Sequence, residues 1–182
     1  MKIKPDHGHF TGNYSLRRPS YTQYLKLWAK AVYPFINDPD DPLTFHRADG
    51  LLIRPLAVMD TDMGTVPRSV RVLISKDRYL DSYLIHDSGC VQGGFDVSSD
   101  GGETWGFVPA SRLIVDQQLR DCIRAQQTEY DPDVRGDRWW SAINAKRRAA
   151  TNLTTRNAIY RAVRAAGGGI WRRRFGDARD CK

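Results

Sequence analysis

Residues 44–60 read TFHRADGLLIRPLAVMD, with two apolar runs, TFHRA and LLIRPLAVM, on either side of Asp49-Gly50. An Asp-Gly pair between apolar runs is a strong signal for a β-hairpin, because both residues tolerate the positive φ of a tight turn. Pro55 has no backbone N–H, so we expect the second strand to lie at a sheet edge or to carry a bulge. The stretch therefore predicts a small antiparallel sheet.

Helical spacing of apolar residues predominates after this hairpin. The expected elements are a helix over residues 69–86, a hairpin over residues 90–109, and helices over residues 111–127, 139–148 and 155–166. Gly89 is expected to stop the first helix, and Ser111 to cap the N-terminus of the second. We therefore predict an α+β fold, in which a small antiparallel sheet with an inserted β-hairpin packs against several α-helices.

The first 43 residues are expected to lie outside this unit. Residues 1–20 are polar and contain several glycines and prolines, which predicts an irregular arm. Apolar residues at near-helical spacing over residues 21–35 predict a short amphipathic helix, with Pro34 at its end. The resulting division is an N-terminal arm and short helix (1–43), an α+β domain (44–171) and an Arg-rich tail (172–182).

The composition excludes several protein classes. With 182 residues, 41% of them hydrophobic, the chain can bury the core of one domain. No run approaches the ~20 apolar residues that a membrane span needs, and the N-terminus lacks the apolar segment of a secretory signal. Cys90, Cys122 and Cys181 are odd in number and form no CxxC pair, which favours free thiols in a reducing cytosol.

The positive charge is concentrated near the C-terminus. The chain has a formal net charge of +7, but residues 138–182 hold 12 basic and 2 acidic residues, so the rest carries a net −3. Such a region favours polyanions, or it is an Arg-rich face that contacts a neighbouring subunit. The candidate nucleic-acid or partner contacts are Trp139, Trp140, Arg172, Arg173 and Arg174.

Two places combine side chains suited to chemistry. The loop over residues 61–68 holds Asp62 and Thr65 on either side of a glycine, which also fits a loop held by local side-chain hydrogen bonds. His86 and Asp87 end the predicted helix, where an imidazole and a carboxylate can bind a metal or act as a base and its partner. A histidine at a helix C-terminus is also favoured by the helix dipole alone.

Asp116 is the most unusual placement in the sequence. It lies on the apolar stripe of its predicted helix, in line with Leu113, Leu119 and Ile123. A carboxylate in a buried position is costly unless it meets a cation, a metal or several hydrogen-bond donors. The alternatives are therefore a functional carboxylate, or a buried salt bridge or cap within the fold.

Residues 98–105, SSDGGETW, fit the pattern S-x-D-x-G-x-T-W. This pattern resembles an Asp-box, a hairpin turn found in sialidases and other β proteins. The resemblance implies that Ser98 and Asp100 hold the turn and that Trp105 packs beneath it. It implies a stabilising element, and one copy in a chain of this length does not make a propeller.

The order of the motifs resembles the DUF1353 family of phage and prophage proteins. Its pattern runs T-D-[GA]-S-x-P-R, a helix ending in H-D, then S-R-x-x-A-D, then Y-x-A-V-R-x-x-G-G, and the similarity covers residues 44–171. The matching residues are Thr61, Asp62, Gly64, Thr65, Pro67, Arg68, His86, Asp87, Ser111, Arg112, Asp116, Tyr160, Ala162, Val163, Arg164, Gly167 and Gly168. Two departures are Thr65, where the family has Ser, and the Asp-box hairpin, which follows His86-Asp87 in place of an aromatic stretch.

The resemblance implies a phage context and a shared site rather than a reaction. The first hypothesis is a virion-associated structural or accessory protein of the tail or capsid, made in the host cytoplasm. Its partners would be other virion proteins and further copies of itself. The alternative is a metal-dependent hydrolase acting on the host cell wall, and a nucleic-acid-binding accessory protein is the third hypothesis. In the hydrolase, Asp62, His86, Asp87 and Asp116 would hold Zn²⁺, Mn²⁺ or Mg²⁺, and Thr65 would orient the substrate.

Overall fold

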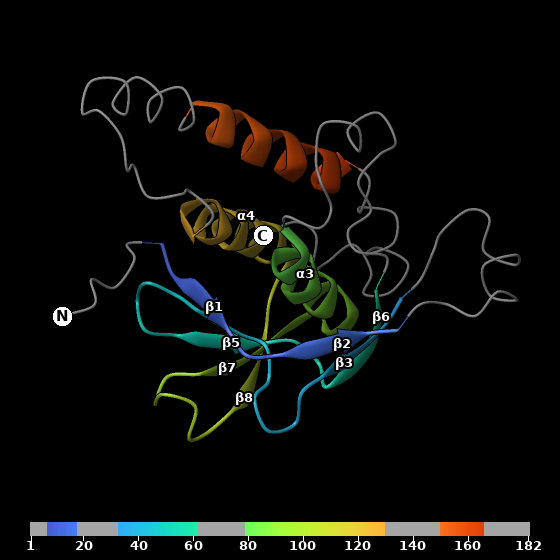
Figure 1. Ribbon diagram of the computed structural model, residues 1–182. Coiled ribbons are helices and arrows are strands. Elements are labelled where there is room, and N and C mark those ends of the chain that lie inside the picture. Colours follow the sequence, from blue (N-terminus) through green and yellow to red (C-terminus); the bar gives the residue numbers. More distant parts are fainter. Residues whose placement is uncertain (1–6, 18–32, 62–78, 130–149, 166–182) are drawn as a thin grey trace, which may run out of the picture.

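The computed structural model describes residues 7–17, 33–61, 79–129 and 150–165, and its elements form two sheets and three helices (Figure 1). The strands are β1 (His9–Thr11), β2 (Tyr14–Leu16), β3 (Tyr33–Asn37), β4 (Thr44–His46), β5 (Leu52–Arg54), β6 (Val58–Thr61), β7 (Gly94–Ser98) and β8 (Gly106–Pro109). The helices are α3 (Leu80–Gln92), α4 (Arg112–Glu129) and one over residues 150–165. The predicted α+β class is confirmed.

The larger sheet has the strand order β1-β4-β5-β7-β8, and every pairing in it is antiparallel. The hairpin predicted around Asp49-Gly50 joins β4 to β5, and Gly50 has the left-handed φ of 91° that its turn requires. The second predicted hairpin joins β7 to β8. It begins at Gly94 rather than at Cys90, because residues 90–92 still belong to α3.

The smaller sheet has the order β2-β3-β6 and corrects two predictions at the N-terminus. Residues 33–37 form strand β3, so the prediction of a helix that continues to Phe35 is wrong there. Pro34 lies in the strand, opposite Asp60, and its carbonyl accepts the N–H of Arg17 at 2.9 Å.

The predicted irregular arm also contributes strands to both sheets. β1 pairs with β4 in the larger sheet, and β2 pairs with β3 in the smaller one. The expectation of an irregular lead-in is therefore wrong for these strands. Short alternating stretches such as YSL are too brief to stand out from a polar background.

Pro55 marks the point where the chain leaves one sheet for the other. β5 ends at Arg54 and is an interior strand, with β4 on one side and β7 on the other, so the predicted edge strand or bulge is wrong. Pro55 follows the strand, where no ladder hydrogen bond is lost. The next residue, Leu56, donates its N–H to Ser88 Oγ on α3 at 2.9 Å.

Helix α3 continues past the residues expected to end it. His86 and Asp87 lie in its middle, and the helix ends at Gly93, which adopts a left-handed φ of 73° and donates its N–H to the Gly89 carbonyl. Gly89 instead allows Phe95 and Val115 to pack closely against α3. A Cβ at Gly89 would lie 2.6 Å from the Phe95 ring and 3.0 Å from Val115 Cγ1.

Helix α4 begins as predicted. Ser111 Oγ accepts the N–H of Ile114 at 3.4 Å, and the Ser111 carbonyl accepts the N–H of Val115, so Ser111 is the N-cap. The helix predicted over residues 155–166 is present over residues 150–165.

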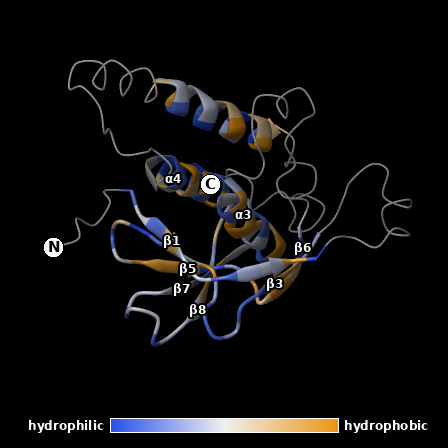
Figure 2. Ribbon diagram, in the orientation of Figure 1, coloured by the Kyte–Doolittle hydropathy of each residue, from blue (hydrophilic) through white to orange (hydrophobic). Residues whose placement is uncertain are grey.

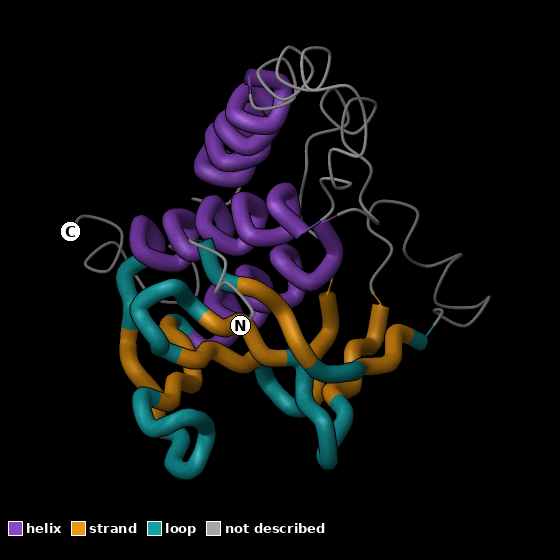
Figure 3. The backbone as a smooth tube through the Cα atoms, turned by 60° about the vertical axis from the view of Figure 1, so that its left-hand side comes forward, coloured by secondary structure: helices purple, strands orange, loops and turns teal. Residues whose placement is uncertain are grey.

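The molecule is layered, with the strands on one side, α3 and α4 against them, and helix 150–165 beyond α4 (Figures 1 and 3). Three consecutive residues of α3, Tyr83, Leu84 and Ile85, are fully buried, and each enters a different hydrophobic cluster. In Figure 2, β5 is coloured as hydrophobic, and α3 carries both hydrophobic and hydrophilic residues. Residues 82–86, Ser88 and Gly89 of α3 are all buried, so α3 is an interior helix and the side chain of His86 lies inside the protein.

The helices of the described part of the chain include none that is both long and apolar enough to cross a bilayer. Several predictions fall outside the described residues. These are Asp62, Thr65, Trp139, Trp140, Arg172, Arg173, Arg174 and Cys181, the helix over residues 139–148, and the parts of the predicted helices over residues 21–32 and 69–78.

Candidate functional site

His86 and Asp116, two of the predicted site residues, meet between α3 and α4. His86 Nε2 lies 2.9 Å from Asp116 Oδ1, and their side chains are 8% and 0% exposed. The sequence singled out three segments, which are loop 61–68, His86-Asp87 and the helix that holds Asp116. This contact between a buried imidazole and a buried carboxylate brings the last two together.

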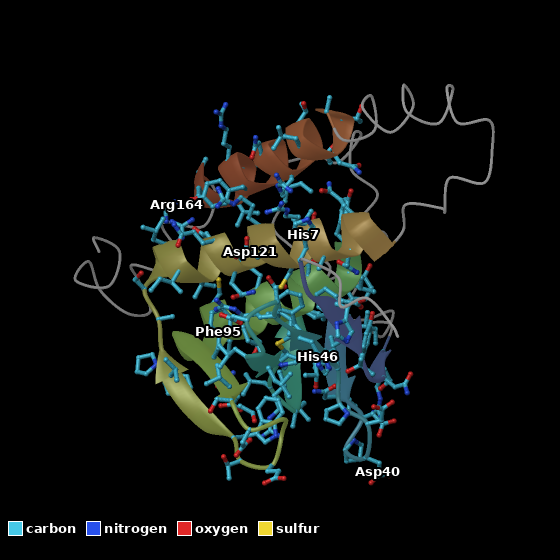
Figure 4. The ribbon with its side chains drawn as sticks, turned by 90° about the vertical axis from the view of Figure 1, so that its left-hand side faces the viewer. His7, Asp40, His46, Phe95, Asp121 and Arg164 are labelled. Atoms are coloured by element: carbon cyan, nitrogen blue, oxygen red, sulfur yellow. The ribbon has the colours of Figure 1, made fainter. Side chains whose placement is uncertain are left out.

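Two arginines complete the surroundings of Asp116. Asp116 Oδ2 lies 3.4 Å from Arg112 Nε, one turn earlier on α4, and 3.2 Å from Arg164 Nη1 on helix 150–165. Arg112 also donates from Nη2 to the carbonyls of Val163 and Arg164, at 2.9 and 2.7 Å. One carboxylate thus joins all three described helices, and the buried salt bridge that the sequence left as an alternative is present. Figure 4 shows Arg164 between α4 and helix 150–165.

Asp87 extends the network to the smaller sheet. Thr61, at the end of β6, donates its hydroxyl to Asp87 Oδ2, and Asp87 Oδ1 lies 3.5 Å from His86 Nδ1. Thr61 is buried and the Asp87 side chain is 15% exposed. We call the set Thr61, His86, Asp87, Arg112, Asp116 and Arg164 the ionic cluster.

The cluster favours a protonated His86. Burial on its own lowers the pKa of the imidazole, but its neighbour Cys90 and the hydrogen bonds with Asp116 and Asp87 together raise it well above its usual range. An imidazolium donates from both ring nitrogens, which matches a carboxylate facing each of them. The charged form therefore fits both neighbours.

Cys90 lies beside the same imidazole, one turn along α3. Its Sγ is 3.6 Å from His86 Nε2 and 3.9 Å from Nδ1. Nucleophilic catalysis needs one ring nitrogen for the nucleophile and the other for the orienting carboxylate. Here the nitrogen nearer to the sulfur is the one that faces Asp116, so the geometry does not form a Cys-His-Asp relay.

The described members of the predicted metal set are engaged with other groups. Both nitrogens of His86 face carboxylates, and Asp116 already faces an imidazole and two guanidinium groups. A divalent cation would add charge beside three cationic side chains, which Coulomb repulsion opposes. Within the described ranges, no three His, Cys, Asp or Glu side chains form a group that could hold a metal ion. Since Asp62 lies outside those ranges, the metal hypothesis stays a prediction.

The cluster members that the sequence analysis did not name as site residues are Thr61, Arg112 and Arg164. All three belong to motifs that it did single out, T-D, S-R and Y-x-A-V-R. The available signal was Arg112 four residues before a carboxylate on the apolar stripe, the spacing of an ion pair on one helix face. The contact with Arg164 depends on tertiary packing between helices and has no local signal.

The Asp-box prediction is confirmed in its local geometry. Ser98 Oγ donates to Asp100 Oδ1 at 2.6 Å and accepts the N–H of Gly102 at 2.9 Å. Asp100 also accepts the N–H and the hydroxyl of Thr104, and the hydrogen bonds from Ser98 and from Thr104 lower the pKa of its carboxyl far below the usual range. Trp105 Nε1 donates to the Gly102 carbonyl at 3.0 Å. Every partner is local, so the motif holds its own turn.

Comparisons with protein-family models, with curated proteins and with solved structures give no match to this chain. The resemblance to the DUF1353 family therefore stays a prediction, carried by the quoted motifs alone.

Proposed function

We propose that the protein is a non-enzymatic structural or accessory component of a phage particle, in the tail or the capsid. In this proposal the role of the ionic cluster is to hold α3, α4, helix 150–165 and β6 in one arrangement. The phage context is supported by the motif resemblance to DUF1353. The structural role is supported by the way the charged side chains of the cluster are paired with one another.

The observation that carries the structural role is the complete engagement of Asp116. Its two oxygens face His86, Arg112 and Arg164, from three different helices, and its side chain is fully buried. A catalytic carboxylate needs an open side from which to reach substrate or water. A buried carboxylate surrounded by cations is instead typical of a network that holds one packing arrangement.

The direct test is the protein content of purified particles. Particles of the phage whose genome encodes this chain would be purified on a density gradient and quantified by mass spectrometry against the major capsid protein. We expect the chain at a fixed copy number per particle. Its presence in the infected-cell lysate together with its absence from the particles would contradict the proposal.

A second assay tests the non-enzymatic part of the proposal. The purified protein would be applied to bacterial cell walls in a zymogram with added Zn²⁺, Mn²⁺ or Mg²⁺, and a phage lysozyme would serve as the positive control. We expect no clearing. Clearing that requires a metal and disappears in Asp116→Asn, at a temperature where that variant is folded, would favour the hydrolase.

A further inference from the structure

We propose that the outer surface formed by α4 and helix 150–165 binds the phosphate backbone of nucleic acid through Arg120, Arg124 and Arg156. This arginine surface is separate from the ionic cluster and goes beyond a structural role in a particle. It is also distinct from the C-terminal arginines singled out in the sequence.

The three guanidinium groups come together from two helices. Arg120 and Arg124 are exposed and lie four residues apart on α4, so they project from the same face about 6 Å apart along the helix axis. Arg156 is half-buried on helix 150–165, which lies over α4 in Figures 1 and 3. The pKa of Arg156 is lowered by partial burial and then by the charges of Arg124 and Arg120. Like charges held this close favour an anion between them.

Arg156 also has a buried N–H group for which no described residue is the acceptor. Its Nε is shielded from solvent, and no hydrogen-bond partner for it exists within the described part of the chain. Asp121 is the acidic neighbour that partly offsets the effect of Arg124 and Arg120 on Arg156. A phosphate at the surface would meet the other nitrogens of this half-buried guanidinium, which presents paired donors that match a phosphate geometrically.

Two neighbouring features extend the surface. The Arg120 guanidinium lies 5.6 Å from the ring centroid of Tyr160, which places an aromatic face beside the arginines. On the other side, Arg124 and Asp121 line a cavity of about 210 Å³ with His7 and Arg47. Figure 4 shows His7 and Asp121 close together at α4. The arginine surface therefore continues into a recess that contains one further arginine, Arg47, which pairs with Asp49 at 2.7 Å.

The chain's overall charge favours nucleic acid over an acidic protein as the partner. The formal net charge is +7, and residues 138–182 alone carry a net +10. A nucleic acid presents a regular row of phosphates, so several separate arginines can each release a counterion. The aromatic ring of Tyr160 adds a surface on which an unpaired base can stack.

The test measures binding of the full chain to a fluorescein-labelled single strand of roughly 20 nucleotides by fluorescence anisotropy, between about 50 and 200 mM NaCl. If the three arginines each neutralise one phosphate of the single strand, the wild type loses affinity about 18-fold over this range. In the variant Arg120→Gln/Arg124→Gln/Arg156→Gln we expect at least about tenfold weaker binding at the lower salt and a nearly flat salt dependence. Each single variant should reduce the magnitude of the log–log salt slope by about 0.7.

Two controls separate this surface from other sources of binding. Arg54→Gln removes an arginine from the five-stranded sheet, where it lies over Trp105, and should leave the affinity unchanged. The variant Arg172→Gln/Arg173→Gln/Arg174→Gln removes the charge of the tail. Thermal unfolding of each variant would confirm that it is folded.

Three results would overturn the proposal. The first is no binding by the wild type at the lower salt. The second is loss of binding in the tail variant with no change in the variant of the arginine surface. The third is displacement of the labelled strand by polyglutamate as effectively as by unlabelled strand, since that would assign the surface to an acidic protein.

Discussion

His86 on α3 and Asp116 on α4 are 30 residues apart in the chain, yet His86 Nε2 lies 2.9 Å from Asp116 Oδ1 in the protein interior. This contact is the centre of the ionic cluster, because Arg112 and Arg164 approach the other oxygen of the same carboxylate. Removal of the Asp116 charge would leave an imidazolium and two guanidinium groups without their shared partner. The stability of the fold should therefore depend strongly on the carboxylate of Asp116.

We expect Asp116→Asn to lower the free energy of unfolding by about 3–5 kcal/mol, the usual effect of removing one partner from a buried charge network. The measurement is urea unfolding followed by far-UV circular dichroism. Asp60→Asn is the control, because Asp60 is an exposed aspartate on β6, and its effect should stay within about 0.5 kcal/mol. Equal stability of the two variants would contradict the structural role. Rescue of Asp116→Asn by a metal would contradict it as well.

The stability should also depend on pH through His86. Its pKa is raised in the folded state, so the imidazolium contributes its full stabilisation below the unfolded value of about 6.5 and loses it as the pH rises through the folded value. We expect the free energy of unfolding to fall between about pH 6.5 and 8, by up to about 1.4 kcal/mol per pH unit. Urea unfolding at several pH values in this window measures the slope.

The choice of this window keeps two buried groups, Cys122 and Tyr83, out of the measurement. The pKa values of Cys122 and Tyr83 are both raised, chiefly by burial, so they too destabilise the fold at high pH, but only above their unfolded values of about 8.5 and 10. His86→Gln should be less stable than the wild type at pH 6.5 and should lack the slope. A slope that persists in His86→Gln would assign the pH dependence to another group.

The sequence predicted the hairpins and the start of α4 because each has a local signal. Asp49-Gly50 marks a turn, Ser111 marks a helix start, and the pattern S-x-D-x-G-x-T-W marks another turn. In each case the partners that matter are a few residues apart in the chain. Local pattern and observed structure therefore agree at these points.

The wrong predictions concern residues whose environment is set by distant parts of the chain. Gly89 looks like a helix stop, but it is a contact point for Phe95 and Val115, which become its neighbours only after α3 packs. Pro34 looks like a helix end, but strands on both sides hold β3 in place. In the site, the sequence placed Asp116 on a buried stripe, while its contact with Arg164 depends on the packing of helix 150–165 against α4.

The close approach at Gly89 makes it intolerant of a side chain. Ala is the better helix former by about 1 kcal/mol, but its Cβ would lie 2.6 Å from the Phe95 ring in a filled core. We expect Gly89→Ala to destabilise the protein by about 1–2 kcal/mol net, as measured by thermal or urea unfolding. Gly106→Ala is the control, because nothing lies within 4 Å of a Cβ at that position. A stabilised Gly89→Ala would show that the helices are not packed this closely.

The Asp-box turn should depend on one buried hydroxyl. Ser98→Ala removes the acceptor of the Gly102 N–H and a donor to Asp100, so we expect a loss of about 1–3 kcal/mol in urea unfolding. The neighbouring Ser99 is exposed, and Ser99→Ala should change the stability by less than about 0.5 kcal/mol. If the two variants are equally stable, the turn is held by its backbone alone.

The two described cysteines should differ sharply in their reaction with a thiol reagent. Cys122 is fully buried, and burial raises the pKa of its thiol, whereas Cys90 is only partly buried. A Cys181→Ala background removes the third thiol from the measurement. A reagent must reach the sulfur, and the thiolate is the form that reacts. With a disulfide reagent at pH 8, the native protein should therefore release one equivalent of the reagent's thiol, and it should release a second equivalent only on unfolding.

The variant Cys90→Ser/Cys181→Ala identifies the thiol that reacts first, because the native protein should then release no equivalent until it unfolds. Labelling at Cys90 should also lower the melting temperature, since a bulky adduct one turn from His86 would crowd the ionic cluster. Two equivalents released at one rate from the native Cys181→Ala protein would show that α3 and α4 separate readily. The ionic cluster would then not hold the helices together on the timescale of the reaction.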